Sequence, residues 1–151
     1  MLDRMYKEYP KGQAPEPLER LAGKIRDADG HVFVAGGYNW GVQPGLKNLT
    51  DHFLEEWFWR PAAIASYSAG RFSGARAATA WHGTLSEMGM VVVSSTIAVG
   101  PIGQSLSAEG EPVGEGGRAH ALPTISCGGW KRPKRSDSAR RRRIDGGIDN
   151  A

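Results

Sequence analysis

The chain has a single cysteine, Cys127, among its 151 residues. One cysteine cannot build a disulfide framework or a cysteine-based zinc site, and its scarcity favours a cytoplasmic protein. No run of about 18 apolar residues occurs, so no membrane span is predicted. The N-terminal residues, Met1 to Arg4, include an acid and lead into no apolar segment, which argues against a signal peptide.

Strong charge of one sign is also missing from most of the chain. Residues 1–117 hold 10 Lys/Arg and 13 Asp/Glu, whereas residues 118–151 hold 9 Lys/Arg and 3 Asp/Glu, so the tail alone accounts for the formal net charge of +3. A nucleic-acid-binding domain carries basic residues on a folded face. We therefore expect a mildly acidic domain over 1–117 that does not bind nucleic acid, followed by a basic, disordered tail over 118–151.

What the chain does contain is an alternation of amphipathic helices with short apolar runs. Residues 1–17 predict a loop, and apolar spacing predicts helices over residues 17–28, 46–59 and 72–88. Apolar runs predict buried strands over 31–35, 62–65 and 90–93, with a Gly/Ser/Pro-rich loop from there to residue 117. This alternation predicts an α/β fold with a parallel sheet covered on both faces. The side chains of helix 46–59 expected to face inward are Leu46, Leu49, Phe53, Leu54 and Trp57.

Two aromatic residues and an amide occupy the loop after the first predicted strand. Tyr38, Asn39 and Trp40 follow Gly36 and Gly37. Ligands of parallel sheets bind at the carboxyl ends of strands, and glycines let the backbone approach a ligand closely. Aromatic rings bind flat π-systems, and an amide both donates and accepts hydrogen bonds. A glycine-rich turn with two surface aromatic residues is the alternative explanation.

The loop after the second predicted strand, residues 66–74, leads directly into a helix. Unpaired backbone N–H groups gather at such helix starts, where hydroxyls and amides suit the polar edge of a heterocycle. An ordinary helix cap by Ser66 or Ser68 is the alternative. The candidate binding residues of this loop are Ser66, Tyr67, Ser68, Ala69, Gly70 and Arg71.

Taken together, the two loops resemble the NADPH-dependent FMN reductase family. The matching features, in order, are Tyr38-Asn39, the segment PGLKN over residues 44–48 with Asp51 beyond it, and the Ser/Gly-rich segment 66–74. The resemblance runs from about residue 18 to about residue 117. It departs from the family at Gly36-Gly37, where the family has Pro-Glu.

The resemblance implies a flavodoxin-like three-layer parallel sheet and an FMN-dependent NAD(P)H oxidoreductase of the flavin or quinone reductase type. Hydride would pass from NAD(P)H to FMN and on to a small acceptor, and the flavin performs that chemistry without a catalytic side chain. The flavin ring would lie against Tyr38, Asn39 and Trp40, and its pyrimidine edge would meet backbone N–H groups of residues 66–70. Homo-oligomers that share the flavin pocket are also implied.

Compared with this family, the chain is expected to be incomplete. The first two strands, the phosphate-binding loop and the last helix have no counterpart in the sequence, so strand 31–35 would have an unpaired edge and FMN binding would be weak. A non-catalytic fragment or a flavin-ring binding module is therefore an alternative. For residues 118–151, three interpretations stay open: a basic tail that touches nucleic acid or acidic surfaces, a solvated tail without a role, or translation in a shifted reading frame.

A second enzyme class fits the placement of Ser68 between a strand and a helix. Residues 66–70 resemble the nucleophile elbow of an α/β-hydrolase, although that motif has Gly where this chain has Ser66. Ser68 would be the nucleophile and His120 the base. The other histidines, at positions 31, 52 and 82, have no metal-ligand spacing, so no metal site is predicted.

Overall fold

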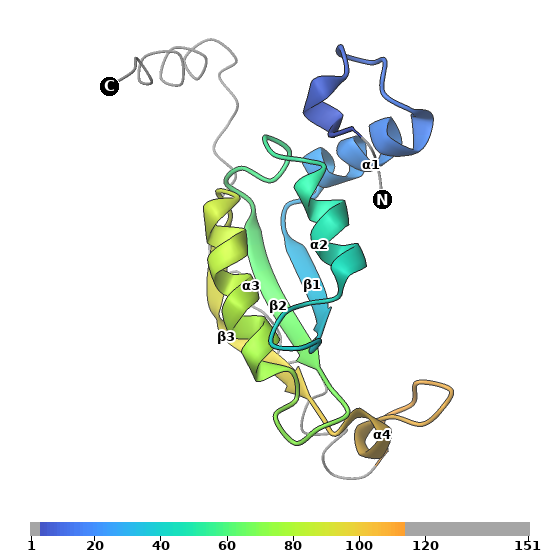
Figure 1. The fold of residues 1–151 in the computed structure, drawn as a ribbon, viewed down its shortest axis with the longest axis vertical. Coiled ribbons are helices and arrows are strands. Elements are labelled where there is room, and N and C mark those ends of the chain that lie inside the picture. The colour runs from blue at the N-terminus through green and yellow to red at the C-terminus, as the bar shows by residue number, and fades with distance from the viewer. Residues whose placement is uncertain (1–3, 114–151) are drawn as a thin grey trace.

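A three-stranded parallel sheet forms the centre of the molecule (Figure 1). The structure is a computed structural model that describes residues 4–113. The strands are β1 (His31–Gly36), β2 (Pro61–Tyr67) and β3 (Val91–Val99), and they lie in the order β1-β2-β3. Both neighbouring pairs are parallel. The α/β class predicted from the alternation of helices and apolar runs is confirmed.

Helices connect the strands and lie at both ends of the sheet. They are η1 (Tyr6–Glu8), α1 (Glu16–Asp27), α2 (Pro44–Asp51), α3 (Ala75–Glu87) and α4 (Ile102–Ser105). Helix α3 packs against all three strands, and Figure 1 shows α2 and α3 on the same side of the sheet. Helix α1 lies near the amino ends of the strands and α4 near their carboxyl ends. The predicted N-terminal loop thus includes the short helix η1.

The core lies between the sheet and the helical layer and is rich in aromatic rings near β1. Phe33 of β1 packs with its ring centroid 5.7 Å from that of Trp57 and 5.9 Å from that of Trp81. Trp81 is 2% exposed and Trp57 5%. Leu18 and Ile25 of α1 belong to the same buried cluster. Burial of such large apolar side chains is the main force that holds the layers together.

The second helix is much shorter than its apolar spacing predicts. Helix α2 ends at Asp51, and the prediction of a helix to residue 59 is wrong. The carbonyl of Thr50 accepts the indole N–H of Trp57 at 3.1 Å, and the N–H of Leu54 donates to the Glu56 carboxylate at 3.3 Å. In a continued helix Leu54 would donate to Thr50 instead. The side-chain bonds replace that helical bond and turn the chain.

The turns after α2 change which apolar side chains are buried. Phe53 and Trp57 are buried as predicted, with 2% and 5% exposure. Leu49 and Leu54, also expected to face inward, are 40% and 38% exposed. Leu54 lies beyond the end of α2, so helical spacing no longer applies to it. Leu49 lies within α2, where the neighbouring Thr50 is the buried residue.

The third strand is longer than predicted, and the loop that follows it begins later in the chain. Strand β3 continues through Ser94, Ser95 and Thr96 to Val99, so the loop predicted to follow residue 93 begins at Gly100. The register with β2 shifts between Ala62 and Ile64, which indicates a bulge. Two extra residues at a bulge break the apolar pattern of the strand, and that break is why the sequence predicted a shorter one.

The outer edge of β1 has no neighbouring strand among the described residues, and one side chain, Gln43, binds it near its carboxyl end. The N–H of Gly36 donates to Oε1 of Gln43 at 2.9 Å, and Nε2 of Gln43 lies 3.4 Å from the carbonyl oxygen of Val34. The amide of Gln43 thus takes the place of a neighbouring strand's peptide group. Val32 and Val34 are 60% and 59% exposed on the sheet face opposite Phe33.

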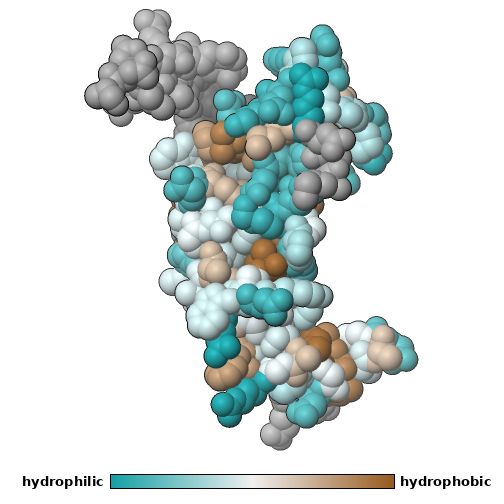
Figure 2. All heavy atoms as spheres, viewed as in Figure 1, coloured by the Kyte–Doolittle hydropathy of each residue, from teal (hydrophilic) through white to brown (hydrophobic). Residues whose placement is uncertain are grey.

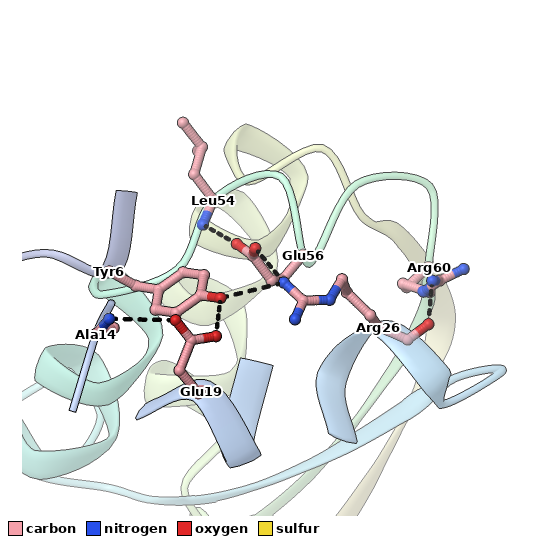
Figure 3. A network of polar contacts seen from close by, with 7 residues as sticks. All are labelled: Tyr6, Ala14, Glu19, Arg26, Leu54, Glu56 and Arg60. Atoms are coloured by element: carbon pink, nitrogen blue, oxygen red, sulfur yellow. Dashed lines mark hydrogen bonds and ion pairs between the residues drawn. The ribbon is translucent and has the colours of Figure 1, made fainter. Parts of the chain in front are cut away.

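A polar network holds the N-terminal segment against the body at the amino end of the sheet (Figure 3). The hydroxyl of Tyr6 donates to Glu19 at 2.7 Å, and Arg26 pairs with Glu56 at 3.0 Å. Burial raises the pKa of Tyr6, and the hydrogen bond to Tyr6 raises the pKa of Arg26. Arg60 donates to the carbonyl of Arg26, which ties the turns after α2 to α1.

Candidate functional site

Three loops meet at the carboxyl end of the sheet. The N–H of Gly37, after β1, donates to the carbonyl of Tyr67 at 2.9 Å. A Cβ placed on Gly37 would lie 3.2 Å from the Cα of Gly74, so the first two loops are in direct contact. The third loop joins them because the N–H of Ile102 donates to the carbonyl of Ser68 at 3.0 Å. The two predicted loops are therefore neighbours.

The loop after β1 presents its aromatic residues on a tight turn. Tyr38 and Gly41 exchange backbone hydrogen bonds of 2.9 and 2.8 Å across Asn39 and Trp40. Asn39 has φ 45° and Trp40 has φ 77°, the left-handed values of a two-residue hairpin turn. This φ is uncommon for a residue as large as Trp. The turn leaves Tyr38 55% and Trp40 66% exposed.

The loop after β2 is held by its own serines. Ser66 is 1% exposed, and its hydroxyl donates to the carbonyl of Ser73 at 2.9 Å. The hydroxyl of Ser68 donates to the carbonyl of Gly70 and accepts from the N–H of Gly74, at 3.0 and 3.1 Å. Residues 69–72 are exposed. Within residues 4–113, the backbone N–H groups of 68–72 donate to no protein acceptor. The loop thus offers a row of free donors.

The structure separates the predicted site residues into two groups. Tyr38, Asn39 and Trp40 lie exposed beside the loop that contains residues 67–71. Ser66 lies in the same place but is buried, and its hydroxyl shapes the loop instead of facing outward.

Two further residues lie at this edge that the sequence did not predict as site residues, Phe72 and Arg76. The guanidinium carbon of Arg76 lies 4.7 Å from the ring centroid of Trp40 and 4.8 Å from that of Phe72. Arg76 belongs to the first turn of α3, where a helical arginine is ordinarily a solvated surface residue. A signal was present in the sequence, since residues 36–46 and 67–80 contain no acid to pair with it.

The geometry around Ser68 gives no support to the hydrolase alternative. The Ser68 hydroxyl makes its bonds to Gly70 and Gly74, and among the described residues no histidine bonds to it. His120, the base of that alternative, lies outside the described residues, as do Cys127 and the whole basic tail.

A cleft of about 370 Å³ lies at the other end of the sheet. It is lined by the N-terminal segment, by α1 and by the turns after α2, and its polar walls are the network of Figure 3. Tyr6, Glu19, Arg26 and Glu56 are bonded to one another there. We regard it as a packing feature of the N-terminal segment.

Residues 4–113 have no group of three or more His, Cys, Asp or Glu side chains that could hold a metal ion. They also have no helix with the length and apolar character needed to cross a membrane.

Comparison with known proteins gives the family. A model of the family described as NADPH-dependent FMN reductase matches residues 2–104. The chain belongs to the NADPH-dependent FMN reductase family. The matched range contains both loops and all three strands, so the resemblance drawn from the loop residues is confirmed.

Individual members of the FMN reductase family match over shorter stretches. An NAD(P)H-dependent FMN reductase of Schizosaccharomyces pombe is 50% identical over 52 residues, which are 34% of this chain and 26% of that protein. A quinone reductase of Escherichia coli is 39% identical over 66 residues, 41% of this chain and 35% of that one. The matches thus span only about a quarter to a third of the length of these relatives.

A solved structure confirms the flavodoxin-like fold. The flavoenzyme NAD(P)H:(acceptor) oxidoreductase FerB from Paracoccus denitrificans superposes with a TM-score of 0.62 at 24% identity. The match covers 74% of this chain and 66% of FerB. At that identity the similarity concerns the fold alone.

Proposed function

We propose that this chain carries the flavin-ring site of an FMN-dependent NAD(P)H oxidoreductase, which passes hydride from NAD(P)H to FMN and then to a small acceptor. The observation that supports this most is the contact between the two loops at the carboxyl end of β1 and β2. The hydrogen bond from Gly37 to Tyr67 joins the loop that exposes the rings of Tyr38 and Trp40 to the loop that carries the free N–H groups of residues 68–72. Ligands of open α/β sheets bind at this edge.

The residues present fit a flavin ring. The pyrimidine edge of a flavin carries two carbonyl oxygens, and the unpaired N–H groups of residues 68–72 are donors of the kind such oxygens need. The tricyclic ring is flat and apolar on its faces, and Tyr38 and Trp40 expose aromatic surface of the kind that stacks on it. Asn39, between them, supplies an amide that both donates and accepts.

Each part of the site would contribute binding and orientation. The side chain of Trp40 would cover one part of the ring, and the turn of residues 68–72 would fix its polar edge. Ser66 and Ser68 hold that turn in shape through bonds to Ser73 and Gly74. Bound FMN would supply the hydride-transfer chemistry, so no side chain has to act as acid or base. We further propose a cytoplasmic protein that forms homo-oligomers.

Titration of the full chain with riboflavin, followed by flavin fluorescence, tests the ring site. Riboflavin carries the ring without a phosphate, so it isolates the contacts named here. We expect Trp40→Ala to weaken riboflavin binding by about tenfold, since a stacked aromatic pair contributes on the order of 1–3 kcal/mol. Trp59→Ala is the matched control, because Trp59 is 57% exposed but belongs to the turns before β2.

Turnover distinguishes an enzyme from a binding module. Oxidation of NADPH is measured at micromolar FMN with a quinone as the acceptor. Oxidation that falls in Trp40→Ala and not in Trp59→Ala supports the oxidoreductase. Flavin binding without any oxidation supports a non-catalytic binding module, and no binding of either flavin would rule out both.

A further inference from the structure

Cations and aromatic rings alternate along the surface beside the loop contact. The guanidinium carbon of Arg71 lies 4.9 Å from the ring centroid of Phe72, and that of Arg76 lies 4.8 Å from the same ring. Arg76 also lies 4.7 Å from the ring of Trp40. We call these four residues, Trp40, Arg71, Phe72 and Arg76, the arginine–aromatic ladder. Figure 2 shows hydrophilic and hydrophobic side chains side by side at this end of the molecule.

The ladder has positive charge and no acid to neutralise it. The three loops at this edge, residues 36–46, 67–80 and 97–108, contain no Asp or Glu. Three basic side chains elsewhere in residues 4–113 form ion pairs, namely Arg20–Glu16, Arg26–Glu56 and Lys47–Asp51. Neither Arg71 nor Arg76 has an ion pair within those residues. Within residues 4–113 their side chains contact aromatic rings and no carboxylate, so the positive charge is available to a ligand.

Stacking also orients each guanidinium group for binding an anion. A ring covers the flat face of the guanidinium and leaves its N–H edge free, and that edge binds phosphate through two parallel hydrogen bonds. The guanidinium carbons of Arg71 and Arg76 lie 4.9 and 4.8 Å from the centroid of the same Phe72 ring, so one side chain holds both cations at this edge. The backbone N–H groups of residues 68–72, which the proposed function assigns to the polar edge of the ring, lie in the turn that also carries Arg71 and Phe72, so the ladder adjoins the ring site.

We propose that Arg71 and Arg76 bind the phosphate monoester of a nucleotide seated at the loop contact. This assignment rests on the proposed function and names the charged part of the same site. Two sources carry such a group: the 5′-phosphate of FMN and the 2′-phosphate of NADPH. The ladder suits both because its rings accept a flat heterocycle while its cations accept a dianion.

Pairs of ligands that differ only in one phosphate identify the source. FMN is compared with riboflavin, and NADPH with NADH, by fluorescence titration of the full chain. In the native chain we expect at least one phosphorylated ligand to bind about tenfold more tightly than its counterpart, as a charge-assisted bidentate contact would give. In Arg76→Gln and Arg71→Gln that preference should shrink, and by more than any change in the affinity for riboflavin or NADH. Arg76→Lys keeps the positive charge but loses the two parallel N–H donors of the guanidinium, so this variant should retain only part of the preference for the phosphorylated ligand.

The control variant is Arg20→Gln, which removes an exposed arginine of α1 at the other end of the sheet. It should leave every preference intact. A lost FMN preference assigns the site to the 5′-phosphate, and a lost NADPH preference assigns it to the 2′-phosphate. Two results would overturn the phosphate assignment and leave the proposed function standing. One is riboflavin binding without any preference for a phosphorylated ligand, and the other is a preference that survives in both glutamine variants. Failure of both flavins to bind overturns the proposed function and the assignment with it.

Discussion

The backbone N–H of Gly37 donates a 2.9 Å hydrogen bond to the carbonyl oxygen of Tyr67, and this bond joins the loops that follow β1 and β2. The contact needs small residues on both sides. A Cβ on Gly37 would stand 3.2 Å from the Cα of Gly74. The close approach of the two backbones brings the turn of residues 68–72, whose N–H groups have no protein acceptor among the described residues, next to the loop that carries the exposed Trp40.

Gly74→Ala should disrupt the contact between the loops that follow β1 and β2. Gly74 has φ 76°, and an added Cβ would lie 2.6 Å from the carbonyl oxygen of Tyr67. The left-handed conformation alone costs a non-glycine residue about 1–2 kcal/mol, and the backbone clash adds to it. Chemical denaturation should report a loss of about 2 kcal/mol or more, together with weaker riboflavin binding.

Gly70→Ala is the control for that variant. Gly70 belongs to the same loop, but nothing lies within 4 Å of its added Cβ and its φ is not in the left-handed range. Its stability should change by no more than about 0.5 kcal/mol. Equal losses in the two variants would show that the loop tolerates no side chain anywhere, and the specific contact would lose its importance.

Gln43→Leu should open the outer edge of β1. The Gln43 amide accepts from the N–H of Gly36 and donates toward the carbonyl of Val34. We expect a loss of about 1 kcal/mol and faster hydrogen exchange of the Gly36 amide. Gln43→Glu keeps the acceptor for Gly36, so exchange there should stay slow. Gln104→Leu, at an exposed position of α4, should change neither quantity.

Much of this fold could be predicted from short apolar runs. Val32 to Ala35 and Ala62 to Ala65 are uniformly apolar, and such runs between helices specify parallel strands. The two loops were found for the same reason, since they follow these strands directly. The extent of α2 and β3 could not be predicted, because it depends on tertiary bonds. The bond from Trp57 to Thr50 ends one helix, and pairing of Thr96 with Ile64 extends one strand.

The absence of acids from residues 36–46 and 67–80 was a signal for free positive charge, but the sequence did not show which side chains meet in the ladder. Arg76 and Trp40 are 36 positions apart, and only the contact of Gly37 with the second loop brings α3 beneath the Trp40 turn. Arg71 was found because it lies within the loop itself. A side chain on the next helix becomes a site residue only after the loops are placed in space.

Trp57→Phe should destabilise the protein more than Trp81→Phe. Both tryptophans are buried and both pack on Phe33. The indole N–H of Trp57 donates to Thr50, whereas that of Trp81 has no hydrogen-bond partner in the described part of the chain. The lost packing is similar in the two variants, so the difference of about 1 kcal/mol measures the hydrogen bond. Urea denaturation of both variants gives that difference, and equal losses would mean that the Thr50 bond contributes nothing.

His31 should make the stability of the protein depend on pH just below neutrality. Burial lowers the pKa of His31 below its ordinary value of 6.5, and the nearby charge of Arg60 lowers it further. The Nε2 atom is buried with no partner among the described residues, and the ring lies 5.0 Å from that of Trp57. The folded protein therefore binds the proton less readily than the unfolded chain. The stability that depends on a neutral His31 is fully present above pH 6.5. It is lost as the pH falls from there through the pKa of His31 in the folded protein.

His31→Phe removes the titrating group and keeps an aromatic ring among Phe33 and Trp57. The native protein should lose more free energy of unfolding between pH about 7.5 and about 5.5 than this variant does. His82→Phe is the control, since His82 lies on α3 away from the β1 cluster and should leave the native pH dependence in place. Thermal or urea unfolding at both pH values measures the difference. Parallel losses in native protein and His31→Phe would mean that carboxylates elsewhere, and not this buried imidazole, set the response to acid.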